Sequence, residues 1–196
     1  MTKKIFVGGV PVGGGERIKI QSMTTARTSD VPAVLGQINA LANAGCDIVR
    51  VAVPDEAAAR AVREIKYASP VPVVADIHFS ARLAVLAIEN GADKVRINPG
   101  NIGGEDKISL VADCVKAHHI PVRVGANTGS IEKGFLEKYG KSELSLVESA
   151  LYNVGILEKH GISDIAISVK ASDVPLTVRA YKLLSQRCDY PLHLGV

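Results

Sequence analysis

The chain has 196 residues, of which 47% are hydrophobic, 22% are charged and 4% are aromatic, and this size predicts a single domain. The composition excludes a disordered tail, a collagen-like repeat and a coiled coil. A formal net charge of +3, with few aromatic residues and no tryptophan, gives no support for nucleic-acid binding, which uses a basic stripe or a stacking surface.

The chain begins with a glycine-rich stretch. Gly13, Gly14 and Gly15 lie between two β-like pieces within residues 4–20. These glycines fit either a β-hairpin that closes the floor of a barrel or a loop that cradles a phosphate group. The hairpin is favoured, because no helix directly follows the glycines.

Beyond this stretch, short β-branched runs alternate with longer amphipathic segments. Most runs are near-continuous apolar stretches, as expected for parallel strands that are covered on both faces. The predicted strands are Ile18–Met23, Ile48–Val53, Val71–His78, Lys94–Asn98, Val122–Ala126, Ile165–Lys170 and Leu192–Val196. Residues that favour helix N-caps precede several of the segments between them, namely Ser29 or Asp30, Asp55, Ser80, Ser142 and Ser172.

This alternation predicts an α/β protein with a parallel sheet, either doubly wound or closed into a barrel. Three strands share a core in which an arginine stands between apolar residues, and such a quasi-repeat favours the equivalent strands of a barrel. A TIM-type (β/α)8 barrel has eight strands and typically about 250 residues. We therefore expect a C-terminally truncated barrel, with about six complete βα units, the start of strand seven and an N-terminal hairpin.

Four cations lie within or at the ends of otherwise apolar strands, and they are Arg50, Arg96, Arg123 and Lys170. An isolated buried cation costs several kcal/mol, and four that face one cavity repel one another. Asp76 is the only acid inside these strands. The pattern therefore predicts an anionic ligand such as a diphosphate, although any single arginine has the alternative of facing the helices and pairing with an acid there.

Two loops rich in Gly and Asn follow the arginine-bearing strands and agree with this prediction. Asn98 opens the first loop and Asn127 lies in the second, and small residues there let backbone N–H groups approach oxyanions. Asp76 and His78 share a strand face, with His193 as a possible third metal ligand. Because four cations disfavour a divalent metal, we predict no metal site and expect His78 to donate hydrogen bonds or carry protons, oriented by Asp76.

The cysteines are Cys46, Cys114 and Cys188, and their wide spacing favours packing roles in a reducing compartment. No signal peptide and no apolar stretch of membrane-spanning length is recognisable. We therefore expect a soluble, cytoplasmic protein that binds neither membranes nor nucleic acid.

The motifs together resemble one family. They begin at Gln21 (Gln-Ser-Met-Thr), Ile48 (Ile-Val-Arg-Val), Val74 (Val-Ala-Asp-Ile-His-Phe), Arg96 (Arg-Ile-Asn-Pro-Gly-Asn-Ile-Gly), Arg123 (Arg-Val-Gly-Ala-Asn), Gly129 (Gly-Ser), Ser168 (Ser-Val-Lys-Ala-Ser-Asp) and Pro191 (Pro-Leu-His-Leu-Gly). In this order they closely resemble the N-terminal part of the 4-hydroxy-3-methylbut-2-enyl diphosphate synthases of the non-mevalonate isoprenoid pathway. The resemblance covers essentially the whole chain.

The resemblance implies an oxidoreductase whose barrel binds 2-C-methyl-D-erythritol 2,4-cyclodiphosphate and opens it by two-electron reduction with loss of water. Arg50, Arg96, Arg123 and Lys170 match the family's diphosphate-binding cations. Asn98 and Asn127 match polar substrate contacts, and the catalytic candidates Asp76 and His78 match residues near the substrate. The family carries a [4Fe-4S] cluster in a separate C-terminal domain, receives electrons from flavodoxin or ferredoxin, and forms homodimers.

None of the three cysteines matches a cluster ligand of that family. We therefore expect residues 1–196 to form an incomplete substrate-binding barrel domain without the iron–sulfur domain. We expect this barrel to bind no cluster and to be inactive alone. It is also expected to be marginally stable, because its sheet has an open edge. Two other readings stay open. The chain is alternatively another TIM-barrel enzyme with a phosphorylated substrate, similar to pteroate synthases, or a non-catalytic diphosphate-binding module.

Overall fold

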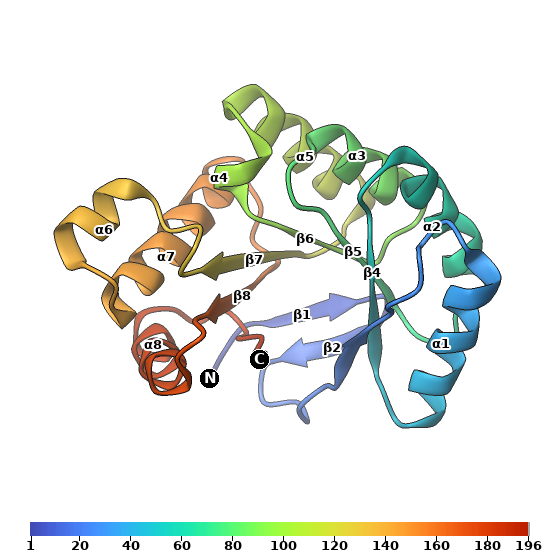
Figure 1. Cartoon of the computed structure of the whole chain (residues 1–196), viewed down its shortest axis with the longest axis horizontal. Helices are drawn as coiled ribbons and strands as arrows, with labels where there is room; N and C mark the ends of the chain where they lie inside the picture. Colours follow the sequence, from blue (N-terminus) through green and yellow to red (C-terminus); the bar gives the residue numbers. More distant parts are fainter. Residues whose placement is uncertain (196) are drawn as a thin grey trace.

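A computed structural model describes residues 1–195 and shows a parallel sheet wrapped by helices (Figure 1). The six strands follow one another in chain order, so every neighbouring pair is joined by a helical crossover. They are β3 (Gln21–Met23), β4 (Ile48–Ala52), β5 (Val73–Asp76), β6 (Lys94–Ile97), β7 (Val122–Asn127) and β8 (Ile165–Lys170). Chain-order pairing in one parallel sheet is the strand order of a TIM-type barrel, which confirms the predicted fold class.

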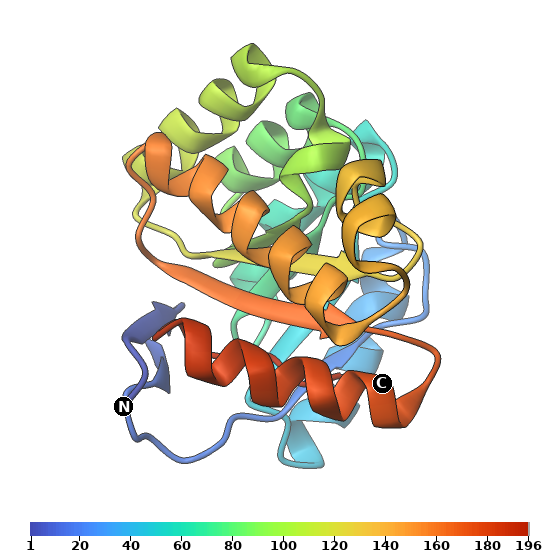
Figure 2. The ribbon, with the colours of Figure 1, turned by 90° about the vertical axis from the view of Figure 1, so that its left-hand side faces the viewer.

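The helices form an outer arc around the strands, from α1 round to α8 (Figure 1). They are α1 (Val31–Asn43), α2 (Glu56–Ala68), α3 (Ala81–Glu89), α4 (Pro99–Ile102), α5 (Glu105–His118), α6 (Lys133–Tyr139), α7 (Glu143–Lys159) and α8 (Val174–Arg187). Figure 2 shows α7 and α8 side by side along the outside of the last strands. The main apolar core lies between this arc and the sheet and includes Val73 and Ala75 of β5.

Side-chain caps begin four of the long helices at predicted positions. Asp30, Asp55 and Ser80 each accept a hydrogen bond from a backbone N–H in the first turn of α1, α2 and α3. Ser142 forms a reciprocal capping box with Ser145 at the start of α7. The prediction of Ser172 as a cap is wrong, because α8 begins after Asp173, whose side chain makes no capping hydrogen bond.

An antiparallel hairpin of β1 (Lys4–Val7) and β2 (Val10–Gly13) precedes the sheet, as predicted. Its turn, however, is Gly8-Gly9 rather than the Gly13–Gly15 stretch. Gly8 and Gly9 have φ of 52° and 86°, and a Cβ on Gly8 would lie 2.6 Å from Asp93 Oδ1. Both turn positions therefore require glycine.

The hairpin covers the end of the barrel at which the strands begin. Val7 of β1 packs with Ile48 and Val74, at the start of β4 and β5, in a second and separate apolar cluster. Val10 and Val12 of β2 pack against that cluster. The polar interior described below therefore lies between this apolar floor and the carboxyl ends of the strands.

Three predicted strands differ from the structure. The run Val71–His78 forms a strand only over Val73–Asp76, so His78 lies beyond the end of β5 rather than on a shared strand face with Asp76. The run Ile18–Met23 forms a strand only over Gln21–Met23. In the run Leu192–Val196, Leu192 makes an isolated parallel bridge to Ile167 of β8, and Val196 lies outside the described residues. None of the helices within residues 1–195 is long and apolar enough to cross a membrane.

Candidate anion-binding site

The three predicted arginines lie on the inner face of neighbouring strands. Arg96 and Arg123 are paired directly across β6 and β7. Arg50 of β4 pairs with Met23 on one side and Val74 on the other, and its guanidinium approaches the Met23 sulfur at 3.0 and 3.2 Å. The alternating direction of side chains in a strand thus places the three cations in one interior.

Asp76 is the carboxylate at the centre of this cluster. It is only 4% exposed, and its oxygens lie 3.3 Å from Arg96 Nη1 and 3.6 Å from Arg50 Nε. His78 Nε2 lies 3.5 Å from the same carboxylate, while its side chain is 58% exposed. One carboxylate is therefore shared by two guanidinium groups and an imidazole, and the described interior keeps an excess of positive charge.

Arg123 has no comparable acidic neighbour. It is 5% exposed, and its buried Nε has no hydrogen-bond partner. Burial, followed by the charges of Arg50 and Arg96, lowers the pKa of Arg123 to about 10. The guanidinium therefore stays charged at neutral pH without a full set of partners, which is the condition under which an arginine favours an added anion.

Gly125 of β7 makes room for Arg96. A Cβ on Gly125 would lie 3.1 Å from Arg96 Nε and 3.2 Å from Ser168 Oγ, tighter than most Cβ contacts. The buried Arg96 Nε also lacks a hydrogen-bond partner. The absence of a side chain at Gly125 therefore lets the Arg96 guanidinium lie flat across β7.

We predict that Gly125→Ala displaces the Arg96 guanidinium and weakens the binding of a diphosphate by about tenfold, or ~1.4 kcal/mol. Stability is expected to change little, because an alanine in a strand offsets part of the strain by reducing the freedom of the unfolded chain. Titration calorimetry and thermal unfolding measure the two effects.

Gly155→Ala is the matched control, since a Cβ at this position on α7 meets no atom within 4 Å. It is expected to stabilise the helix by about 1 kcal/mol and to leave diphosphate affinity unchanged. Equal affinities of the two variants would contradict the role of Gly125.

The two predicted asparagines are held within the loops that follow β6 and β7. Asn98 caps α4 by accepting a hydrogen bond from the Gly100 N–H at 3.1 Å, and its amide donates to Ser130 Oγ at 3.4 Å. The Asn127 N–H donates to the same Ser130 hydroxyl at 3.2 Å. Ser130 therefore links the two loops.

The first loop is also tied to α7. The Gly100 N–H donates to Asn153 Oδ1 at 2.9 Å, and Asn153 in turn donates to Glu132 Oε1 at 2.8 Å. The Gly100 N–H is therefore used within the fold, because two side-chain oxygens already accept from it. The Asn98 side chain therefore holds the first loop, whereas Asn127 bonds Ser130 through its backbone N–H and carbonyl oxygen.

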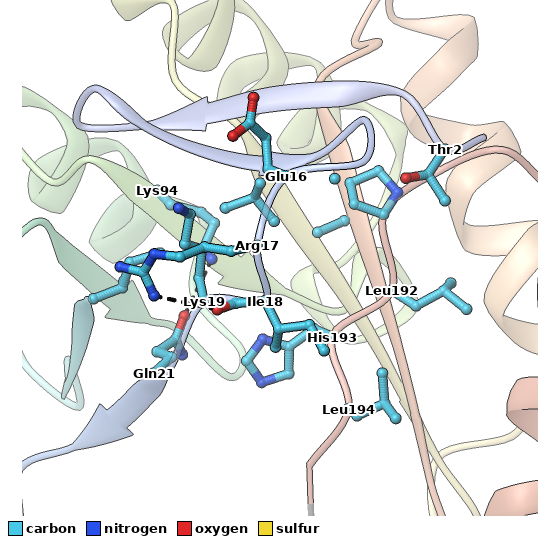
Figure 3. Close-up of a pocket in the computed structure, with 15 residues that line it drawn as sticks. Thr2, Glu16, Arg17, Ile18, Lys19, Gln21, Lys94, Leu192, His193 and Leu194 are labelled. Atoms are coloured by element: carbon cyan, nitrogen blue, oxygen red, sulfur yellow. Dashed lines mark hydrogen bonds between the residues drawn. The ribbon is translucent and has the colours of Figure 1, made fainter. Parts of the chain in front are cut away.

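Two adjoining cavities occupy the interior. The outer cavity, about 380 Å³, lies near the carboxyl ends of the strands and is lined by Gln21, Ser22, Met23, Arg50, Arg123, Ser168, Lys170, His193, Leu194 and Gly195. The inner cavity, about 340 Å³, lies toward the hairpin and includes Arg17, Lys19, Gln21, Ile48, Lys94 and His193 in its lining (Figure 3). The structure thus brings Arg50, Arg123 and Lys170 to one cavity, with Arg96 and Asp76 behind them.

Sequence reasoning missed Lys94. This lysine is 3% exposed, lies two residues before Arg96 on the same face of β6, and donates to Gln21 Oε1 at 3.2 Å. Burial, reinforced by Arg123 and Arg50, lowers the pKa of Lys94 to about 7. The same strand parity that groups Arg96 with Asn98 would have identified it.

His193 faces the cations from the segment after α8 and lines both cavities. Burial, followed by the charges of Arg123, Lys94, Arg50 and Lys170, lowers the pKa of His193 to about 3. Its imidazole is therefore neutral at physiological pH and adds no charge to the cluster.

The described residues do not fit an iron–sulfur cluster or another metal. No group of three or more His, Cys, Asp or Glu side chains within residues 1–195 has a metal-binding arrangement. Cys46 follows α1 and donates to the Ile48 carbonyl oxygen, Cys114 lies within α5, and Cys188 ends α8. The cysteines lie on separate elements and act as packing residues.

These observations define a class, the TIM-type β/α barrels, and within it a barrel whose interior carries buried cations. The chain belongs to the GcpE family, because residues 2–196 match the model of the GcpE TIM-barrel domain. It is 54% identical over 197 residues to the 4-hydroxy-3-methylbut-2-en-1-yl diphosphate synthase (flavodoxin) of Caldanaerobacter subterraneus subsp. tengcongensis. It is 54% identical over 196 residues to the synthase of the same name from Geobacter sulfurreducens.

Both alignments cover 100% of this chain and 56% of the relative, so the chain spans a little over half the length of the curated relatives it matches. The predicted family resemblance is thereby confirmed.

Among solved structures, a type I 3-dehydroquinate dehydratase from Clostridium difficile matches with a TM-score of 0.71 and 14% identity, covering 98% of this chain and 79% of that chain. A dihydropteroate synthase from Xanthomonas albilineans matches with a TM-score of 0.67 and 15% identity, covering 96% of this chain and 74% of that chain. At these identities the likeness concerns the fold alone.

Proposed function

We propose that residues 1–196 form the substrate-binding barrel of a 4-hydroxy-3-methylbut-2-enyl diphosphate synthase and bind 2-C-methyl-D-erythritol 2,4-cyclodiphosphate. The observation that carries this proposal is the excess of buried positive charge around the outer cavity. Arg50 and Arg96 share the carboxylate of Asp76, and Arg123 forms no ion pair among the described residues. A cyclic diphosphate supplies the negative charge and the several acceptor oxygens that these groups require.

In this proposal the side chains that line the outer cavity bind the phosphates. Arg50 and Arg123 present planar guanidinium groups suited to bidentate contacts, and Lys170 at the exposed end of β8 supplies a point charge. Arg96 is held by Asp76 and by the space at Gly125, so it reaches the ligand from a fixed position. Asn98 and Asn127 shape the rim through the loops that they hold.

His78 and Asp76 are the groups proposed for proton transfer. The His78 imidazole lies between the Asp76 carboxylate, 3.5 Å away, and open solvent. A carboxylate in this place orients the ring, and an imidazolium is the form that donates a proton to a leaving hydroxyl group. Loss of that hydroxyl as water belongs to the proposed reaction.

The two electrons of the proposed reduction have no donor among the described residues, which do not form a cluster site. We propose that they come from a [4Fe-4S] cluster held by residues other than 1–196, fed by flavodoxin or ferredoxin, in a homodimer. The names of the curated relatives, which include flavodoxin, support the carrier.

Titration of the purified protein with the cyclic diphosphate tests the proposal. We expect saturable binding with one site, displaced by pyrophosphate and weakened by salt, because charge dominates the contact. A pterin diphosphate is the comparison ligand. Binding of the pterin compound without binding of the cyclic diphosphate would support a pteroate-synthase-like transferase and contradict our proposal.

A further inference from the structure

We propose that Lys94, a buried lysine whose printed partner is the uncharged Gln21, is a proton-accepting member of the anion site and takes up a proton when a diphosphate binds in the outer cavity. The inference deepens the proposed function and rests on it. It concerns a residue two positions below Arg96 on β6 that lines the inner rather than the outer cavity.

The position of Lys94 leaves its amine few ways to hold a charge. Its amine donates to Gln21 Oε1, an uncharged oxygen, across the interior from β6 to β3. Its neighbours in the sheet include the apolar Val74 of β5. No described carboxylate lies within ion-pair distance of its nitrogen, whereas Lys66, on the outer surface, lies 2.8 Å from Asp93. A fully desolvated ammonium group without an acid is strongly disfavoured.

The charged groups that face Lys94 are predominantly positive. Arg50 on β4 and Arg123 on β7 act on it directly. The inner cavity is also lined by neutral His193, from the segment after α8 (Figure 3). From the linker before β3 it is lined by Arg17 and Lys19, and by Glu16 as the one acid in its lining. Burial, followed by the charges of Arg123 and Arg50, lowers the pKa of Lys94 to about 7, so a small change in local charge alters its protonation near neutral pH.

A bound diphosphate is such a change. Its charges would neutralise Arg50 and Arg123, the two groups that repel a proton on Lys94. Gln21 and His193 line both cavities, so the outer ligand and the inner amine are separated by one layer of side chains. Binding would therefore raise the pKa of Lys94 and draw a proton from solvent, and affinity would fall as pH rises above 7.

Calorimetric titration of the purified protein with inorganic pyrophosphate, at pH 8 in two buffers of different ionisation enthalpy, measures the protons taken up. Per bound anion, we expect the wild type to take up as much as about one proton more than Lys94→Met. This variant removes the amine and keeps a side chain of similar length. Because pyrophosphate itself titrates, the difference between the proteins is the result that matters. Lys133→Met is the control, since its side chain is 90% exposed, and it should match the wild type.

A second measurement avoids the variant and covers the case in which Lys94→Met does not fold. In protein labelled with ¹³C-lysine, one Cε signal is expected to titrate near pH 7, and saturating pyrophosphate is expected to move that titration above pH 9. Binding without extra proton uptake, or a signal that titrates at the same pH with and without the anion, overturns the proposal for Lys94 alone. Absence of any pyrophosphate binding by the wild type overturns both this proposal and the proposed function.

Discussion

Arg123→Ala is expected to weaken the binding of the cyclic diphosphate by about 3 kcal/mol, or roughly 100-fold in Kd. The arginine is buried, lines the outer cavity and has an unpartnered Nε, so its attraction is available to a ligand rather than used in the fold. The folded chain binds the guanidinium proton less tightly than the unfolded chain. The charge therefore opposes folding at every pH below about 10.

Loss of affinity should thus come without loss of stability once the volume is filled. Arg123→Met keeps much of the side-chain volume, and we expect its Tm at pH 7 to equal or exceed that of the wild type. Arg60→Ala is the control, because that side chain on α2 is 68% exposed. Unchanged affinity in both Arg123 variants would remove this residue from the site.

Asp76→Asn is expected to destabilise the protein by about 3 kcal/mol, because it removes the one carboxylate shared by Arg50 and Arg96, whose side chains are only 24% and 11% exposed. For a chain of this size the loss corresponds to a decrease in Tm of roughly 10 °C. Thermal unfolding at several pyrophosphate concentrations measures it.

An added anion should partly replace the missing carboxylate. We expect pyrophosphate to raise the Tm of Asp76→Asn by more than it raises the Tm of the wild type. Asp113→Asn is the control, since its carboxylate is 68% exposed and its pairing with Lys116 contributes little. A variant as stable as the wild type would show that Asp76 does not balance the arginines.

Most of the fold could be predicted because its signals are local. Apolar runs gave the strands from β4 to β8, and short polar side chains such as Asp55 and Ser142 gave helix starts. Helix α6 was missed because none of its residues is buried, so it has no apolar periodicity. The hairpin turn was misplaced although its signal is local, because Gly8 and Gly9 both have a positive φ, and only the close approach of Gly8 to Asp93 joins distant parts of the chain.

The part of the candidate site that could be predicted is the set of residues that share one face of the same strand. Strand parity grouped Arg96 with Asn98 and Arg123 with Gly125. Strand parity could not predict which side chains on different elements form hydrogen bonds with one another. The contact of Lys94 with Gln21 crosses the sheet interior, and the bonds of Gly100 to Asn98 and Asn153 join a loop to α7. Such contacts depend on how the strands curve and not on the sequence around each residue.

The arginines are placed in the middle of paired strands and not on loops, and this has a thermodynamic consequence. Freeing any one of them requires breaking the ladder that joins β4 to β7. A bound anion therefore acts as a cross-link between strands, and its binding adds about 2.7 kcal/mol to the free energy of global unfolding at a ligand concentration of 100 Kd. When the anion binds, amide hydrogen exchange should slow to the same extent throughout the central strands. Exchange of amides in outer helices that unfold locally, independently of the sheet, should not slow.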